Sequence, residues 1–175
     1  MSERVRKYPT IGCCGIDCGL CPRYYTDGTS RCPGCDGDGF PDKHPSCSFI
    51  TCCVKKHGLE VCAECGEFPC QRFDKETGER DSFVTHRRVM PNQRLIIEIG
   101  VYAFLEQQSR RIAFLETSLE RYNDGNSKRL YCLAAAILSI DSLNKALSLA
   151  ENGENLRNVL AGFAEAEGQE LKLRK

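Results

Sequence analysis

Cysteine is the residue type most able to do chemistry in this chain. Twelve of the 13 cysteines lie between Cys13 and Cys70, and only Cys132 follows them. The charged N-terminus is not followed by an apolar run, so we expect no secretion signal and a reducing, cytoplasmic environment. Disulfides are disfavoured there. Dense cysteine in such a protein predicts metal binding or thiol redox chemistry.

Two Cys-x-x-Cys pairs predict a first metal site. Cys18 and Cys21 form one pair, and Cys32 and Cys35, beyond ten intervening residues, form the next. Two intervening residues allow a tight turn to direct both thiolates at one ion, with backbone N–H groups facing the sulfurs. Two such turns complete a tetrahedral site of four sulfurs. This spacing is typical of zinc knuckles.

A third pair predicts a second site. Cys62 and Cys65 need two further ligands, and Cys47 and Cys52 precede them at a suitable distance. Cys14 and Cys70 are alternates or additional ligands. His57, five residues beyond Cys52, is a further alternative.

Cys13 and Cys53 each adjoin another cysteine. A single tetrahedral ion rarely takes vicinal ligands, so we expect these two to be free thiols.

The identity of the metal follows from the ligand set. Closed all-thiolate sites are typical of structural zinc, so two Zn²⁺ per chain is the first expectation. The spacing Cys14-x3-Cys18-x2-Cys21 also suits a [4Fe–4S] cluster of a ferredoxin-like or regulatory protein. Thiol redox chemistry at Cys32-Pro33-Gly34-Cys35 is a third reading, although no βαβ pattern surrounds it.

The surrounding pattern predicts a mainly α fold with two parts. Residues 8–72 are rich in turn residues and poor in aliphatics, which predicts an irregular cysteine-rich module with zinc-knuckle-like turns, held by metal. Beyond it, apolar residues recur every three or four positions. We expect helices at 92–122, from about 127, at 141–150 with Asp141 as N-cap, and from about 156. The module should pack on this C-terminal bundle of three to four helices, at 85–168.

Other functions receive little support. The net charge is zero and the pI about 6.8, so nucleic-acid binding is possible but not favoured, and a protein partner is expected instead. The pairs Arg87-Arg88, Arg110-Arg111 and Lys128-Arg129 are interpreted as salt-bridged helix surface, with an RNA or anion patch as the alternative. No catalytic triad order or phosphate-binding loop is present, which disfavours an enzyme. No apolar stretch is long enough for a membrane helix.

The cysteine pattern resembles that of the DUF3795 family, small cysteine-rich proteins of archaea and anaerobic bacteria. The resemblance rests on Cys14-Gly-Ile-Asp-Cys18-Gly-Leu-Cys21, the Cys32, Cys47 and Cys62 motifs, and Cys65-Gly-Glu-Phe-Pro-Cys70. Tyr122-Asn-Asp-Gly125 and Tyr131-Cys132-Leu133-Ala134 extend it to roughly 10–150. The resemblance implies ten family-type cysteines, which exclude Cys13 and Cys53. It also implies zinc binding, but it supplies no reaction.

Overall fold

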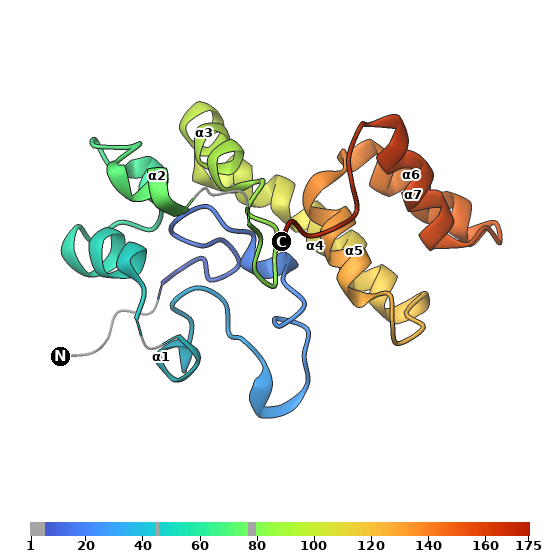
Figure 1. The fold of residues 1–175 in the computed structure, drawn as a ribbon, viewed down its shortest axis with the longest axis horizontal. Coiled ribbons are helices and arrows are strands. Elements are labelled where there is room, and N and C mark those ends of the chain that lie inside the picture. Colours follow the sequence, from blue (N-terminus) through green and yellow to red (C-terminus); the bar gives the residue numbers. More distant parts are fainter. Residues whose placement is uncertain (1–5, 45, 77–79) are drawn as a thin grey trace.

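A computed structural model describes residues 6–44, 46–76 and 80–175. In these ranges the chain is helical and contains no strand, which confirms the mainly α fold (Figure 1). Within the same ranges, none of the helices has the length and apolarity that crossing a bilayer requires. A cysteine-rich N-terminal region lies against a bundle of longer C-terminal helices.

The cysteine-rich region consists of short helical turns joined by loops. They are η1 (Cys18–Leu20), η2 (Gly28–Ser30), α1 (Phe40–Lys43), the π-helical η3 (Ile50–Lys56), η4 (Cys62–Glu64) and α2 (Gln71–Glu76). Its small core combines aromatic and aliphatic side chains with thiols: Cys13, Cys35, Phe40, Phe49, Ile50, Cys53, Val54, Phe73 and Val89. Val89 is the first residue of α3, so this core includes part of the helical half.

The helical half contains α3 (Val89–Ile99), α4 (Val101–Arg121), α5 (Lys128–Ile137), α6 (Ile140–Glu151) and α7 (Leu156–Ala166). The expectation of one helix over 92–122 is wrong, because Gly100 separates α3 from α4. Gly100 has a φ of 83°, a left-handed conformation that glycine adopts without a steric penalty. Of the five helices described in this half, four, α4 to α7, share the core of the bundle, in agreement with the expected three to four.

The start of α6 also differs from the expectation. Asp141 lies inside the first turn, and the N-cap is Ser139, whose hydroxyl accepts a hydrogen bond from the Ser142 N–H at 3.1 Å. Serine is among the best N-cap residues. The predicted stop at Asn152-Gly153 is confirmed, since Asn152 is the C-cap.

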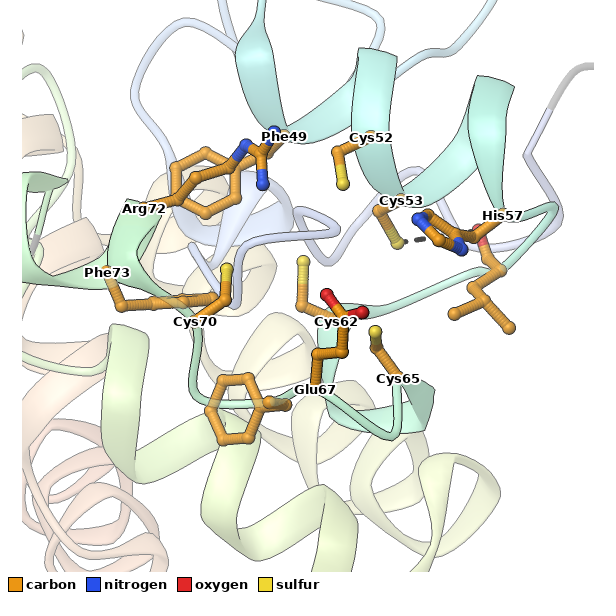
Figure 2. A pocket seen from close by; sticks show the side chains of 12 residues that line it. Phe49, Cys52, Cys53, His57, Cys62, Cys65, Glu67, Cys70, Arg72 and Phe73 are labelled. Carbon is orange, nitrogen blue, oxygen red and sulfur yellow. Dashed lines mark hydrogen bonds between the residues drawn. The ribbon is translucent and has the colours of Figure 1, made fainter.

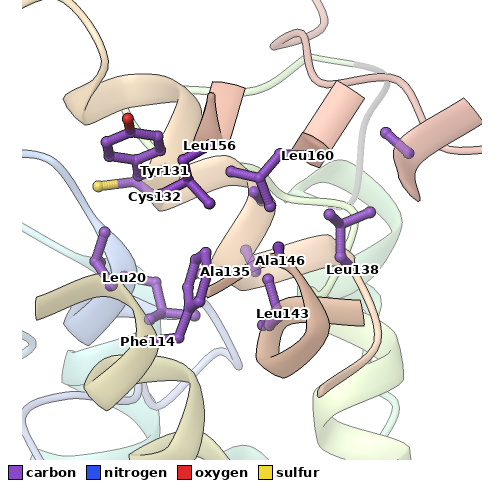
Figure 3. Packing of buried hydrophobic residues seen from close by; sticks show 14 of the residues in the cluster. Leu20, Phe114, Tyr131, Cys132, Ala135, Leu138, Leu143, Ala146, Leu156 and Leu160 are labelled. Carbon is purple, nitrogen blue, oxygen red and sulfur yellow. The ribbon is translucent and has the colours of Figure 1, made fainter. Parts of the chain in front are cut away.

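The core of the bundle is made of aliphatic side chains and alanines (Figure 3). Leu138, Leu143 and Leu160 are almost completely buried, and Ala134, Ala135 and Ala146 allow α5, α6 and α7 to approach closely. Leu20, from the cysteine-rich region, packs into the same cluster. Apolar burial stabilises this core, which also includes Phe114, Tyr131 and Cys132.

Three buried amide side chains join the two halves. Gln93 of α3 accepts a hydrogen bond from the Ala63 N–H at 2.7 Å and donates one to the Cys13 carbonyl at 2.8 Å. Asn92 and Gln108 both donate to the carboxylate of Asp17, which is itself buried. Burial raises the pKa of Asp17, while these amide hydrogen bonds lower it. The amides fix the cysteine-bearing loops on α3 and α4.

The C-terminal tail returns to the middle of the molecule (Figure 1). The buried carboxylate of Asp81 accepts hydrogen bonds from the Arg174 backbone N–H at 2.8 Å and from its guanidinium at 2.9 Å. Arg87 donates to the carbonyls of Glu170 and Lys172. The residues after α7 are thus tied to the connection between the two halves.

Candidate metal centre

The Cys18-x-x-Cys21 and Cys62-x-x-Cys65 knuckles have the same backbone conformation. Each of η1 and η4 is a single 3₁₀ turn, closed by N–H···O=C bonds from Cys21 to Cys18 at 3.2 Å and from Cys65 to Cys62 at 3.0 Å. The sulfur of Cys21 accepts hydrogen bonds from the backbone N–H groups of Arg23 and Tyr24. The tight turns that the sequence predicts at these two pairs are therefore present.

The turn at Cys32-Pro33-Gly34-Cys35 depends on its glycine. Gly34 has a φ of 89°, and a Cβ atom there would lie 2.3 Å from the Pro9 carbonyl oxygen. The Cys35 N–H donates to the same oxygen at 2.8 Å. The glycine therefore allows this pair to lie close against the N-terminal segment.

The four cysteines of the first predicted site approach one another as two pairs. Cys18 hydrogen-bonds the sulfur of Cys35, and Cys21 lies near enough to Cys32 for their charges to interact. Burial raises the pKa of Cys21. It also raises the pKa of Cys132, a thiol of the helical core that lies near Cys21. The four cysteines of the first predicted site therefore lie near one another, with Cys18 and Cys35 toward the interior.

Cys13 lies at the centre of a larger thiol cluster. The sulfur of its fully buried side chain lies within hydrogen-bonding reach of the sulfurs of Cys35, Cys53 and Cys62, and these contacts together with burial raise its pKa. The pKa of Cys35 is lowered because Cys13 and Cys18 hydrogen-bond its sulfur. Hydrogen bonds from Cys13 and Cys62 lower that of Cys53. Cys13 and Cys53, which were expected to be free thiols apart from the sites, thus connect Cys35 of the second Cys-x-x-Cys pair with Cys62 of the third.

A buried cation accompanies this cluster. The guanidinium of Arg6 donates to the carbonyls of Ile11, at 2.8 Å, and Cys35, at 3.3 Å, and lies 3.6 Å from the Glu60 carboxylate. Burial lowers its pKa, but the adjacent sulfurs of Cys35 and Cys13 raise it above the ordinary value. A permanently charged guanidinium in this position favours thiolates over thiols.

A second group of thiols surrounds a small pocket (Figure 2). The cavity measures about 30 Å³ and is lined by Phe49, Cys52, Cys53, His57, Leu59, Cys62, Cys65, Glu67, Phe68, Cys70, Arg72 and Phe73. That volume holds one water-sized particle. The Cys70 sulfur hydrogen-bonds Arg72, which raises the pKa of the guanidinium. Three members of the second predicted site, Cys52, Cys62 and Cys65, thus meet Cys70 and the alternative ligand His57.

Cys47, the fourth member of that predicted site, lines a different pocket. It shares this pocket with Cys14, Phe49, His86 and others, and Phe49 lines both pockets. Cys14 and Cys47 are close enough for their charges to interact, and burial raises the pKa of Cys14 to about 12. The structure thus pairs Cys47 with Cys14, one of the alternates, rather than with Cys62 and Cys65.

None of the thirteen cysteines, all of which lie in the described ranges, is disulfide-bonded. Among those residues no three Cys, His, Asp or Glu side chains already stand around a common point as ligands of one ion. The thiols instead contact one another in pairs and chains. The donor set nevertheless fits thiolate ligation in type and number, and the contacts between sulfurs would be exchanged for contacts with an ion.

This arrangement of knuckles can be compared with known families. Residues 10–75 match the DUF3795 family. The family is described as a protein of unknown function, and the match contains all twelve N-terminal cysteines. The resemblance inferred from the cysteine spacing is confirmed for this DUF3795 segment, whereas the motifs at Tyr122 and Tyr131 lie outside it. No curated protein and no solved structure matches the chain.

Several residues in and around the DUF3795 segment contact the cysteines but were not predicted from the sequence. Arg6 and Arg72 bring cations to the two thiol groups, and Gln93 holds the backbone of Cys13. A lone arginine or glutamine carries no spacing signal. The vicinal positions of Cys13 and Cys53 pointed away from the cluster, because spacing along the chain does not report contacts between distant segments.

Proposed function

We propose that this protein is a non-enzymatic, cytoplasmic zinc protein whose cysteine module binds about two Zn²⁺ ions and serves as an interaction or regulatory module. The observation that carries the proposal is the convergence of thiols from separate chain segments onto two neighbouring groups. Zinc would cross-link these segments through thiolate bonds and so stabilise a region with a small apolar core.

The first ion would be held by Cys18, Cys21, Cys32 and Cys35. Support comes from the contact of Cys18 with Cys35, the proximity of Cys21 to Cys32, and the N–H groups directed at the Cys21 sulfur. Amide hydrogen bonds to a ligating thiolate spread its negative charge, as ligand-supporting hydrogen bonds do at metal sites generally.

The second ion would be held by Cys52, Cys62, Cys65 and Cys70. These four line one cavity with room for a single particle, and His57 stands at its edge. Four thiolates around Zn²⁺ leave a net negative charge, and Arg72 beside Cys70 offsets it. Cys13 and Cys53 would support both groups through hydrogen bonds, and Cys14 and Cys47 stay alternates.

A second candidate is an iron–sulfur protein for electron transfer or redox sensing. One observation favours it: Cys14 and Cys21, which with Cys18 have the spacing of three cluster ligands, both lie within electrostatic range of Cys18.

Metal analysis of protein purified without oxygen tests both candidates. The zinc proposal predicts a colourless protein with about two zinc per chain. Iron and sulfide in comparable amounts, with absorbance near 400 nm that bleaches on reduction, would establish the second candidate instead. The absence of both metals would refute metal binding altogether.

Single substitutions sharpen the assignment. Cys65→Ser should reduce the zinc content to about one per chain, because a ligand of the second site is lost. Cys132→Ala is the matched control: it also removes one thiol, but from the helical core, and should leave two zinc ions bound. Equal zinc loss in both variants would contradict the assignment.

A further inference from the structure

A large groove lies away from the two clusters of cysteines, on another part of the molecule. It has a volume of about 800 Å³ and is lined by Pro22, Arg23, Thr26, Ser30, Ser82, Phe83, Gly125, Asn126, Lys128, Arg129 and Leu173. The walls come from four places: the loop between Cys21 and Cys32, the connection before α3, the turn that leads into α5, and the C-terminal tail at Leu173. Grooves of this size accept small organic ligands.

The charged side chains that line the groove are all cationic. Arg23, Lys128 and Arg129 contribute three positive charges, and no aspartate or glutamate is found among the described residues of the lining. The nearby carboxylate of Asp124 is already engaged by the Ser127 hydroxyl at 2.6 Å and the Arg157 guanidinium at 3.3 Å. An anion is therefore the complementary ligand.

Two of these cations occupy a place that the helix itself disfavours. Lys128 and Arg129 are the first two residues of α5, and the first turn contains no acidic residue. Positive charge is unfavourable at a helix N-terminus, because the macrodipole is positive there. Local choices that conflict with helix physics are expected where function requires them.

An exposed aromatic ring completes the groove. Phe83 is 56% exposed, which is unusual for a phenylalanine, and the guanidinium of Arg23 lies 4.9 Å from the centre of its ring. Exposed aromatic rings and arginine planes are the surfaces on which nucleobases stack. Lys128 uses one of its three donors on the Tyr25 carbonyl at 2.9 Å, so others can face the groove.

We propose that this groove binds a nucleotide unit, with a base stacked at Phe83 and Arg23 and phosphate held by Lys128 and Arg129. The same chemistry is offered by a free nucleotide and by single-stranded RNA. The proposal does not depend on the identity of the metal. It also gives Lys128-Arg129, interpreted from sequence as salt-bridged surface, a different role.

Fluorescence anisotropy of the full chain distinguishes the two sources. One arm uses a labelled twelve-residue oligouridine, and the other uses labelled ATP. Binding of the oligonucleotide that weakens steeply with salt identifies single-stranded RNA, because phosphate contacts release counterions. Saturable binding of ATP alone identifies a free nucleotide. Failure to bind either probe at about 1 mM protein overturns the proposal.

Substitutions locate the site. Arg129→Glu should weaken binding of the active probe about tenfold or more, and Phe83→Ala by about threefold to tenfold. Arg94→Glu is the matched control, since it reverses an exposed charge on α3 outside the groove. Circular dichroism verifies each fold, and Arg129→Gln replaces Arg129→Glu if the reversed charge unfolds α5. Equal losses with Arg94→Glu and Arg129→Glu would show non-specific attraction and overturn the site.

Discussion

The two halves of this protein have cores of different chemical kinds. The helical half buries leucines and alanines between α4, α5, α6 and α7. The cysteine-rich half buries phenylalanines together with thiols that contact one another. The first core is stabilised mainly by apolar burial, whereas the second contains thiols that contact one another and could also bind a metal. Under the zinc proposal, metal binding would give the second half a source of stability that the first half does not use.

Metal removal should produce the largest difference in stability between the two halves. Under the zinc proposal, a chelator should abolish amide-hydrogen protection across residues 10–75 and leave α5–α7 largely protected. Structural zinc contributes about 10 kcal/mol or more in small modules. Hydrogen exchange read by mass spectrometry provides the measurement. Unchanged protection in the cysteine-rich half would mean that its core is sufficient without metal.

A substitution in the helical core should destabilise the helical half without affecting the metal sites. Leu160→Ala removes a fully buried side chain and should lower the free energy of unfolding by about 2–5 kcal/mol, because it leaves a cavity. The zinc content should not change. Urea unfolding and metal analysis of the same samples provide the two readouts. Parallel loss of zinc would contradict the separation between the two cores.

A smaller effect is expected at the junction. Gln93→Leu keeps roughly the same volume but leaves the part-buried Ala63 N–H and the Cys13 carbonyl without their side-chain partner, which costs about 1–3 kcal/mol. Exchange protection should fall in η4 and at Cys13 more than in α6 and α7. Gln169→Leu, the same substitution at an exposed position, serves as control. Protection lost only within α3 would show that Gln93 does not join the halves.

The smallest effect concerns the C-terminal tail. Burial opposes ionisation of Asp81, but hydrogen bonds from Arg174 and His86 more than compensate and lower its pKa to about 2. Because the folded pKa lies below the ordinary value, this contribution is complete above about pH 4 and disappears as the pH falls toward 2. It is on the order of 1 kcal/mol, since Arg174 is partly exposed and screened.

The NMR signal of the Arg174 amide, which donates to Asp81, reports this titration directly. It should shift with a midpoint near pH 2 in the wild type and not titrate in Asp81→Asn. A midpoint near pH 4 would contradict the lowered pKa.

Sequence reasoning located what local patterns encode. The helices after residue 127 were predicted because their apolar periodicity ends at recognisable stops such as Asn152-Gly153. The break at Gly100 was missed because the apolar spacing continues from Ile97 to Val101 across it. The role of Cys13 was missed because it depends on Cys35, Cys53 and Cys62, up to 49 positions away. The ligand sets proposed above stay predictions.

The amide bridge at Gln93 has a consequence for what can exist as a separate domain. The matched segment, residues 10–75, ends before α3 begins at Val89. Yet Ile11 and Val61 of that segment are fully buried against Ile96 and Phe104 of α3 and α4. A fragment cut at the segment's end would expose this apolar surface and lose the partners of Cys13, Ala63 and Asp17. The sequence signature is therefore shorter than the folding unit that contains it, and only a fragment that extends through α4 retains these partners.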